Sequence, residues 1–112
     1  ILKYKNDCHE IMARRQITVL ESSIWGQPEF FSMLLQPYEN TTNISNEPLG
    51  LAIDEALILA QDMGGIMEYC HGTGIKLNHL LARDIGFSLD TIRSIKRTLD
   101  PSNIMNPGKL GL

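Results

Sequence analysis

The sequence predicts an α+β fold in which a small antiparallel sheet carries helices on one face and a helical segment forms the C-terminal end. Apolar residues recur at helical spacing in residues 4–14, 48–63 and 88–99, while short apolar runs occupy 17–20 and 30–35. Hydrophobic residues make up 43% of the 112 residues, which argues against a disordered chain. Helices combined with a few strands predict layered α+β packing.

The first predicted elements are a helix and two strands. Residues 4–14 are expected to be helical because their apolar side chains fall on one face, with charged residues between them. Ile17 to Leu20 is rich in β-branched residues and predicts a strand, which Gly26-Gln27-Pro28 ends. Residues 30–35 predict the second strand. The apolar positions of the helix are Tyr4, Cys8, Ile11 and Met12.

A polar loop and a long helix follow. Residues 36–48 are polar and contain prolines, so we expect a surface loop. The apolar stripe of the helix over 48–63 is wide enough to pack on more than one side. Gly64-Gly65 should end this helix, because glycine adopts the left-handed turn at little steric cost. The stripe consists of Leu49, Ile53, Ala56, Leu57, Ala60 and Met63.

The remaining chain predicts a third strand and two more helices. Residues 66–70 form a short apolar run of strand length, and residues 77–84 predict a helix that Gly86 ends. In the last helix, Ser88 is the expected N-cap and Asp90 lies in the first turn, where it meets the helix dipole. A three-stranded sheet has exposed edges, which predicts either further strands or a homodimer formed with a second copy.

A histidine follows the predicted third strand directly. The strand would deliver His71 to its end, and the glycines that follow, Gly72 and Gly74, would let the backbone approach a ligand closely. An imidazole there can take up or release a proton near neutral pH. The residues alone leave a second interpretation open, in which His71 is a turn residue satisfied by local backbone.

A second motif lies near the C-terminus. Residues 95–109, with the sequence IKRTLDPSNIMNPGK, closely resemble the ending of FAD-linked oxidases of the vanillyl-alcohol-oxidase superfamily. In these proteins the last helix runs into an aspartate-proline and then an asparagine-proline-glycine-lysine tail. The order and distance from Gly64-Gly65 through the His71 segment to this tail also resemble the family. The resemblance covers about residues 51–112.

The resemblance implies FAD as cofactor and a particular domain organisation. Family members have an N-terminal domain that binds FAD and a substrate domain that covers the flavin ring. By this resemblance, residues 1–86 belong to the substrate (cap) domain, as a fragment of its ferredoxin-like fold. Residues 87–112 would pack back on an FAD-binding domain of the same chain, outside this sequence. The sequence alone is then expected to be an inactive C-terminal fragment.

The resemblance also implies a reaction and its residues. Relatives of the glycolate oxidase and D-lactate dehydrogenase type oxidise small 2-hydroxy acids, so a hydroxy-acid substrate is expected. His71 matches the histidine of a glutamate-histidine-glycine motif and would be the catalytic base. Gly72, Gly74 and Asn106 of the tail would contact the cofactor. Cys70 replaces the family glutamate, and strand geometry would place the nearby Glu68 on the face opposite to His71.

A metal-binding histidine pair of the family has no counterpart here. Ile24 and Phe31 stand where those histidines would be, and Met33 stands where a polar substrate ligand would be. Aliphatic and phenyl side chains cannot coordinate a metal. We therefore expect no metal site of the family type, and we expect a divergent branch with another substrate.

Two alternatives to a hydroxy-acid oxidase remain open at this point. One is a stand-alone, non-catalytic α+β interaction module. The other is a flavoenzyme like the alkyl-dihydroxyacetone-phosphate synthases, which build an ether lipid and also lack the glutamate. A net charge of −3 gives no footprint for nucleic acid, and no run approaches the roughly 18 apolar residues of a transmembrane helix. Two cysteines and a start without a leader predict a cytoplasmic protein.

Overall fold

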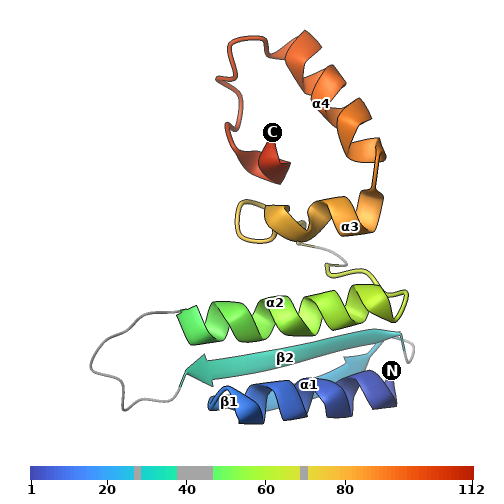
Figure 1. Cartoon of the computed structure of the whole chain (residues 1–112), viewed down its shortest axis with the longest axis vertical. Helices are drawn as coiled ribbons and strands as arrows, with labels where there is room; N and C mark the ends of the chain where they lie inside the picture. Colours follow the sequence, from blue (N-terminus) through green and yellow to red (C-terminus); the bar gives the residue numbers. More distant parts are fainter. Residues whose placement is uncertain (27–28, 38–46, 69–70) are drawn as a thin grey trace. The chain divides into compact units, whose positions relative to one another are not determined.

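The computed structural model describes residues 1–26, 29–37, 47–68 and 71–112, and the chain divides into two compact units (Figure 1). The first unit is Ile1–Asp62 and the second is Met63–Leu112. The helices and strands, in chain order, are α1 (Leu2–Arg14), β1 (Ile17–Trp25), β2 (Phe30–Pro37), α2 (Glu47–Asp62), η1 (Asn78–Leu80), α3 (Leu81–Ile85), α4 (Ser88–Leu99) and η2 (Lys109–Gly111).

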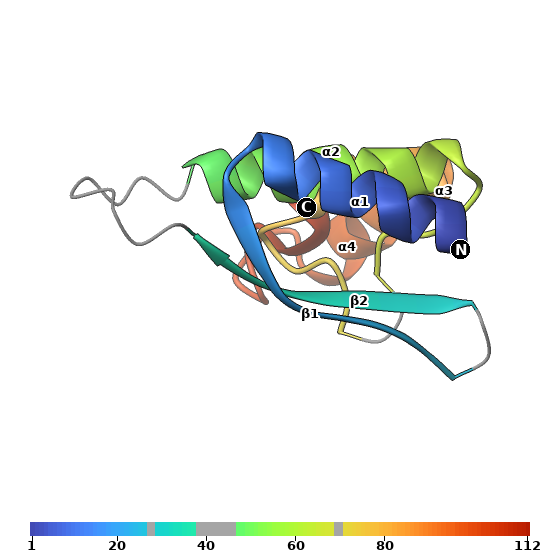
Figure 2. The same ribbon diagram turned by 90° about the horizontal axis from the view of Figure 1, so that it is seen from below.

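The first unit is an antiparallel hairpin covered by two helices. β1 pairs with β2 from Ile17 opposite Pro37 to Trp25 opposite Phe30, with a bulge between Val19 and Glu21. Figure 2 shows α1 and α2 side by side on the same face of this hairpin. The α+β prediction, with helices on one face of a small antiparallel sheet, is therefore confirmed.

A small apolar core joins the helices to the hairpin. Tyr4 on α1 packs edge-on against Phe31 of β2, with ring centroids 5.5 Å apart, and its hydroxyl donates to the carbonyl of Ala56 at 2.9 Å. Burial raises the pKa values of Tyr4 and Cys8 above their ordinary ranges. The buried core residues are Cys8, Ile11, Met12, Ile17, Ala52 and Ala56. Three of the four apolar positions predicted for the first helix are thus buried, and Cys8 and Met12 are fully buried.

An ion-pair cluster ties α1 to α2 at the edge of this core. Both Arg14 and Arg15 bind the carboxylate of Glu55, and Arg15 Nε donates to Glu55 Oε2 at 2.9 Å. The hydrogen bond from Arg15 holds the pKa of Glu55 below its usual range. The end of α1 is therefore fixed against the middle of α2 by charge as well as by packing.

The second unit consists of short helices and turns. Leu80, Leu81 and Leu89 are buried in it, together with Met67. Gly86, with φ of +53°, separates α3 from α4 as predicted. The apolar seam expected along the last helix is only partly buried, because Leu89 is covered whereas Ile95 and Leu99 are exposed.

Two predictions for this unit are wrong. Residues 66–68 do not form a strand, and within the described residues the sheet has two strands. The backbone N–H of Met67 instead faces the carboxylate of Asp84, at 3.4 Å. Ser88 is not the N-cap of α4, because Phe87 occupies that position without a side-chain cap. Backbone bonds such as Asp90 N to Phe87 O, at 3.0 Å, hold the first turn.

The predicted loop over 36–48 and two residues of the predicted third strand lie largely outside the described residues. The helix predicted over 77–84 is present as η1 followed by α3. The helices predicted over 4–14, 48–63 and 88–99 match α1, α2 and α4 to within two residues at each end. The partition of function at residue 86 stays a prediction, while the boundary between compact units falls at residue 62.

Candidate functional site

His71 lies on the surface of the second unit and contacts a carboxylate. Its backbone N–H donates to Glu68 Oε1 at 2.9 Å, and its ring Nδ1 lies 3.4 Å from the same oxygen. The imidazole is 85% exposed, whereas the Glu68 side chain is only 22% exposed. A half-buried carboxylate thus lies beside the Nδ1 side of an exposed ring. Glu68 was predicted to lie on the opposite face from His71, and this prediction fails because residues 66–68 are not a strand.

The residues after His71 form a backbone surface without obstructing side chains. We call residues His71–Gly74 the glycine loop. Gly72 and Gly74 adopt φ values of +72° and +56°, which residues with a side chain rarely take. A Cβ added at either position would meet nothing within 4 Å. Backbone conformation therefore requires these glycines, and the space around them is open to a ligand.

Thr73, between the two glycines, holds a buried hydroxyl without a hydrogen-bond partner. Its carbonyl accepts from the backbone N–H of Leu77 at 3.1 Å, which starts the turn into η1. An unsatisfied buried polar group costs about 1–3 kcal/mol. Thr73 was not among the predicted site residues, although its position between two glycines was an available signal.

The C-terminal tail, residues 106–112, returns to the glycine loop. The Leu110 N–H donates to the Gly74 carbonyl at 3.2 Å, and the Asn78 side-chain amide donates to the Gly108 carbonyl at 3.4 Å. Asn106 is exposed, with φ of +48°, and its carbonyl accepts from the Lys109 N–H at 3.3 Å. The structure thus brings the tail to Gly74, one of the predicted cofactor contacts.

A buried carboxylate organises the turn that precedes the tail. Asp100 is buried, binds the ammonium group of Lys96, and accepts the backbone N–H groups of Ile104 and Met105, each at 2.9 Å. The Lys96 hydrogen bond holds the pKa of Asp100 below its usual range, and the two backbone bonds act in the same direction. The Lys96 side chain is therefore largely buried against this turn. Spacing of four residues between Lys96 and Asp100 was the available signal.

The positions matched to metal-binding histidines lie in the hairpin of the first unit. Ile24 and Phe31 are directly opposite each other in the register, and Phe31 packs against Tyr4. Met33 lies beside the core cluster. Across the part of the chain that the structure describes, no group of three or more His, Cys, Asp or Glu side chains is arranged to hold a metal.

An open groove of about 440 Å³ lies on the helical layer of the first unit. Its lining mixes apolar side chains with ion pairs, including Lys3 with Asp7 and Arg14 with Glu55. The groove contains none of the predicted site residues.

Within the described residues, no helix is both long enough and apolar enough to cross a membrane.

The C-terminal part of the chain is similar to known proteins. The family described as FAD linked oxidases, C-terminal domain, matches residues 43–110. The mitochondrial D-lactate dehydrogenase (cytochrome) of Arabidopsis thaliana is 44% identical over 52 residues. That stretch covers 46% of this chain but only 9% of the relative's length. No solved structure matches the chain. The matched range includes the glycine loop, the Asp100 turn and nearly all of the tail.

Proposed function

Because the chain belongs to the family of FAD linked oxidase C-terminal domains, we propose that it is the C-terminal part of an FAD-dependent oxidoreductase acting on a small 2-hydroxy acid. The supporting observation is the exposed His71 imidazole, held by Glu68 and followed by an open glycine loop. The similarity to a D-lactate dehydrogenase supports a substrate of the lactate type. The expected cytoplasmic location stays a prediction, because that relative is named as mitochondrial.

The residues of the glycine loop fit an approaching planar cofactor. Gly72 is exposed and Gly74 is half-buried, and the space where their side chains would be is empty. The orphaned Thr73 hydroxyl adds a polar atom in the same loop. Gly72, Gly74 and Asn106 of the tail are the residues that would hold the flavin. Bound FAD supplies the acceptor for the hydride that leaves the substrate carbon.

His71 is the residue proposed to move the substrate proton. Glu68 lies on the Nδ1 side of the ring, and Nε2 is the atom proposed to take the proton of the substrate hydroxyl. The contact with Glu68 would hold the ring in place while Nε2 takes the proton. Glu68 would therefore be the carboxylate beside His71, although it stands two residues before Cys70, which replaces the glutamate of the family motif.

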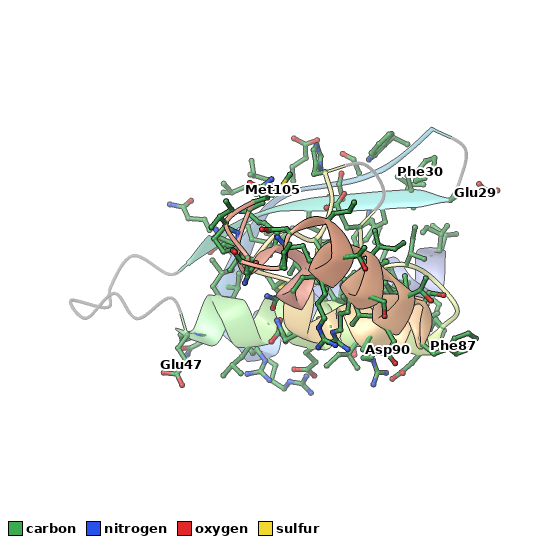
Figure 3. All side chains as sticks on the ribbon, turned by 90° about the horizontal axis from the view of Figure 1, so that it is seen from above. Glu29, Phe30, Glu47, Phe87, Asp90 and Met105 are labelled. Atoms are coloured by element: carbon green, nitrogen blue, oxygen red, sulfur yellow. The ribbon has the colours of Figure 1, made fainter. Side chains whose placement is uncertain are left out.

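An exposed apolar surface supports a docking role for residues 87–112. Phe87 is 88% exposed and points away from the ribbon at the start of α4 (Figure 3). Leu99 is 73% exposed and Ile104 is 78% exposed, and Met105 is also exposed. Phe87 lies at the start of α4, and the other three lie at its end or beyond it. Large exposed apolar side chains are typical of a surface that another domain covers. We assign them to the interface with the FAD-binding domain, and the 112 residues alone should then be inactive.

A variant series in the full-length protein tests this function. His71→Ala should lower turnover of D-lactate with an artificial electron acceptor by about 100-fold or more, the usual contribution of a general base. Bound flavin, measured by its visible absorbance, should be unchanged. His79→Ala is the matched control, because His79 is an exposed histidine on η1 outside the glycine loop.

The outcomes separate the competing functions. Unchanged turnover in His71→Ala would remove this histidine from the reaction. A colourless full-length protein that binds no FAD would instead support the non-catalytic interaction module, an interpretation that the Cys70, Ile24 and Phe31 replacements favour. A yellow protein that forms an ether bond without net oxidation would support the ether-lipid branch.

A further inference from the structure

The turn after α4 is built around one carboxylate that uses both of its oxygens. Asp100 Oδ1 accepts from Ile104 N, while Oδ2 accepts from Met105 N and binds Lys96 Nζ. Lys96 closes the ring by donating to the Met105 carbonyl at 2.6 Å. Burying a carboxylate is costly unless it is paired, so this set of bonds strongly favours one path for residues 100–105.

The residues after this turn have restricted backbone conformations. Asn103 and Asn106 both adopt positive φ, and Gly108 has φ of +77°. The Gly108 N–H donates to the Leu112 carbonyl at 3.0 Å, so the last residues form a compact turn. The tail therefore has a defined conformation. Its position depends on the position of residue 105, which the Asp100 turn fixes.

The tail supplies long-range hydrogen bonds that hold the glycine loop and the turn after it. Gly72 and Gly74 have no side chains, and glycine permits many backbone conformations. Leu110 N binds the Gly74 carbonyl, and Gly108 accepts from Asn78. Within the loop, the bond from Leu77 N to Thr73 O is local and spans a single turn. The long-range restraint on Gly74 thus comes through the tail.

From these contacts we infer that Asp100 is a positioning residue, which sets the conformation of the glycine loop carrying His71 through the Lys96 pair and the C-terminal tail. The effect on turnover rests on the proposed function of His71, but the effect on the loop does not. Loss of the Asp100 carboxylate should release the tail, loosen Gly74 and let His71 sample unproductive positions.

The test compares three variants of the full-length protein. Asp100→Asn removes the charge, and a truncation after Gly108 removes the Leu110 N–H while leaving the Asp100 turn intact. Asp90→Asn is the matched control, since Asp90 pairs with Arg93 on the exposed side of the same helix. Amide hydrogen exchange at Leu77, the NMR signals of the His71 ring, and kcat and KM are measured for each.

Asp100→Asn and the truncation should both speed exchange at Leu77 by about tenfold and shift or broaden the His71 ring signals, whereas Asp90→Asn should do neither. Both should lower kcat more than they raise KM. Changes confined to residues 100–105, or equal effects of Asp90→Asn, would overturn the inference. If Asp100→Asn fails to fold, Lys96→Met takes its place, because it removes the ammonium partner of Asp100 and keeps the carboxylate. A His71→Ala variant with full turnover would refute the proposed function and leave the exchange result intact.

Discussion

One carboxylate oxygen of Glu68 lies 2.9 Å from the backbone nitrogen of His71 and 3.4 Å from Nδ1 of its ring. The Glu68 side chain thus contacts both the backbone and the ring of His71. It also places a carboxylate beside Nδ1 of an exposed imidazole. Glu68 therefore contributes directly to the orientation of His71.

Glu68→Gln should lower the turnover of the full-length enzyme by about tenfold, the equivalent of about 1.4 kcal/mol. The glutamine oxygen can still accept the His71 N–H, but a neutral amide forms a weaker contact than a carboxylate and holds the ring less firmly. Steady-state rates with saturating D-lactate measure the effect. Glu47→Gln, at the exposed start of α2, should leave the rate unchanged. Equal rates for wild type and Glu68→Gln would show that the contact has no part in the reaction.

Gly72→Ala should destabilise the chain by about 1–2 kcal/mol, because its φ of +72° strains any residue with a Cβ. The space around Gly72 is open, so the cost comes from the backbone and not from a clash. Gly50→Ala is a sharp control, since Gly50 lies in α2 with equally open space. There alanine should stabilise by about 0.5–1 kcal/mol. Urea unfolding measures both, and equal signs would contradict this account.

The Asp100 carboxylate should make the stability of the second unit sensitive to acid. The Lys96 hydrogen bond lowers the folded-state pKa of Asp100, so the folded state binds this proton more weakly than the unfolded state does. The stabilisation is complete above the unfolded pKa, about 3.9, and is lost as the pH falls through the folded value.

Unfolding of the chain followed from pH 7 to pH 2 tests this dependence. Asp100→Asn should be less stable at pH 7 and should lose less stability on acidification than the wild type. Asp90→Asn, which changes an exposed carboxylate of the same helix, should follow the wild-type curve closely. Parallel curves for the wild type and Asp100→Asn would be evidence against the Lys96 pair as the cause.

Met12→Ala should destabilise the first unit by about 2–5 kcal/mol, because Met12 is fully buried at the centre of the core. The loss combines removal of apolar contacts with a cavity that the rigid hairpin cannot fill. Leu20→Ala is the matched control, since Leu20 lies at the bulge and is more than half exposed. Its cost should stay within about 0.5 kcal/mol. Equal losses of unfolding free energy for Met12→Ala and Leu20→Ala would show that Met12 is not at the centre of the core.

Most elements of this fold were predictable because their signals are local. The spacing of Cys8, Ile11 and Met12 predicts the buried face of α1 without reference to any other segment. Gly86 marks the end of α3 for the same reason, since a positive φ favours glycine wherever it occurs. The third strand failed because a short apolar run such as residues 66–68 becomes a strand only when a neighbouring strand accepts its hydrogen bonds.

The candidate site was predictable in part. His71, Gly72 and Gly74 were identified from a motif, and the structure places them in one exposed loop, but their role stays a proposal. Thr73 and the Lys96–Asp100 pair were missed, because burial of a hydroxyl or a carboxylate depends on what packs over it. Asn106 was identified from the tail motif, and the structure shows the tail beside Gly74.

The helices, the two strands and the residues of the family motifs can be identified without coordinates, because periodicity and backbone preference act over a few residues. The contact of Glu68 with His71 and the hydrogen bond from Leu110 to Gly74 could be found only from the folded unit. Hydrogen bonds between segments distant in the chain form only after the intervening helices have packed. Their partners depend on how the whole unit closes and not on any local pattern.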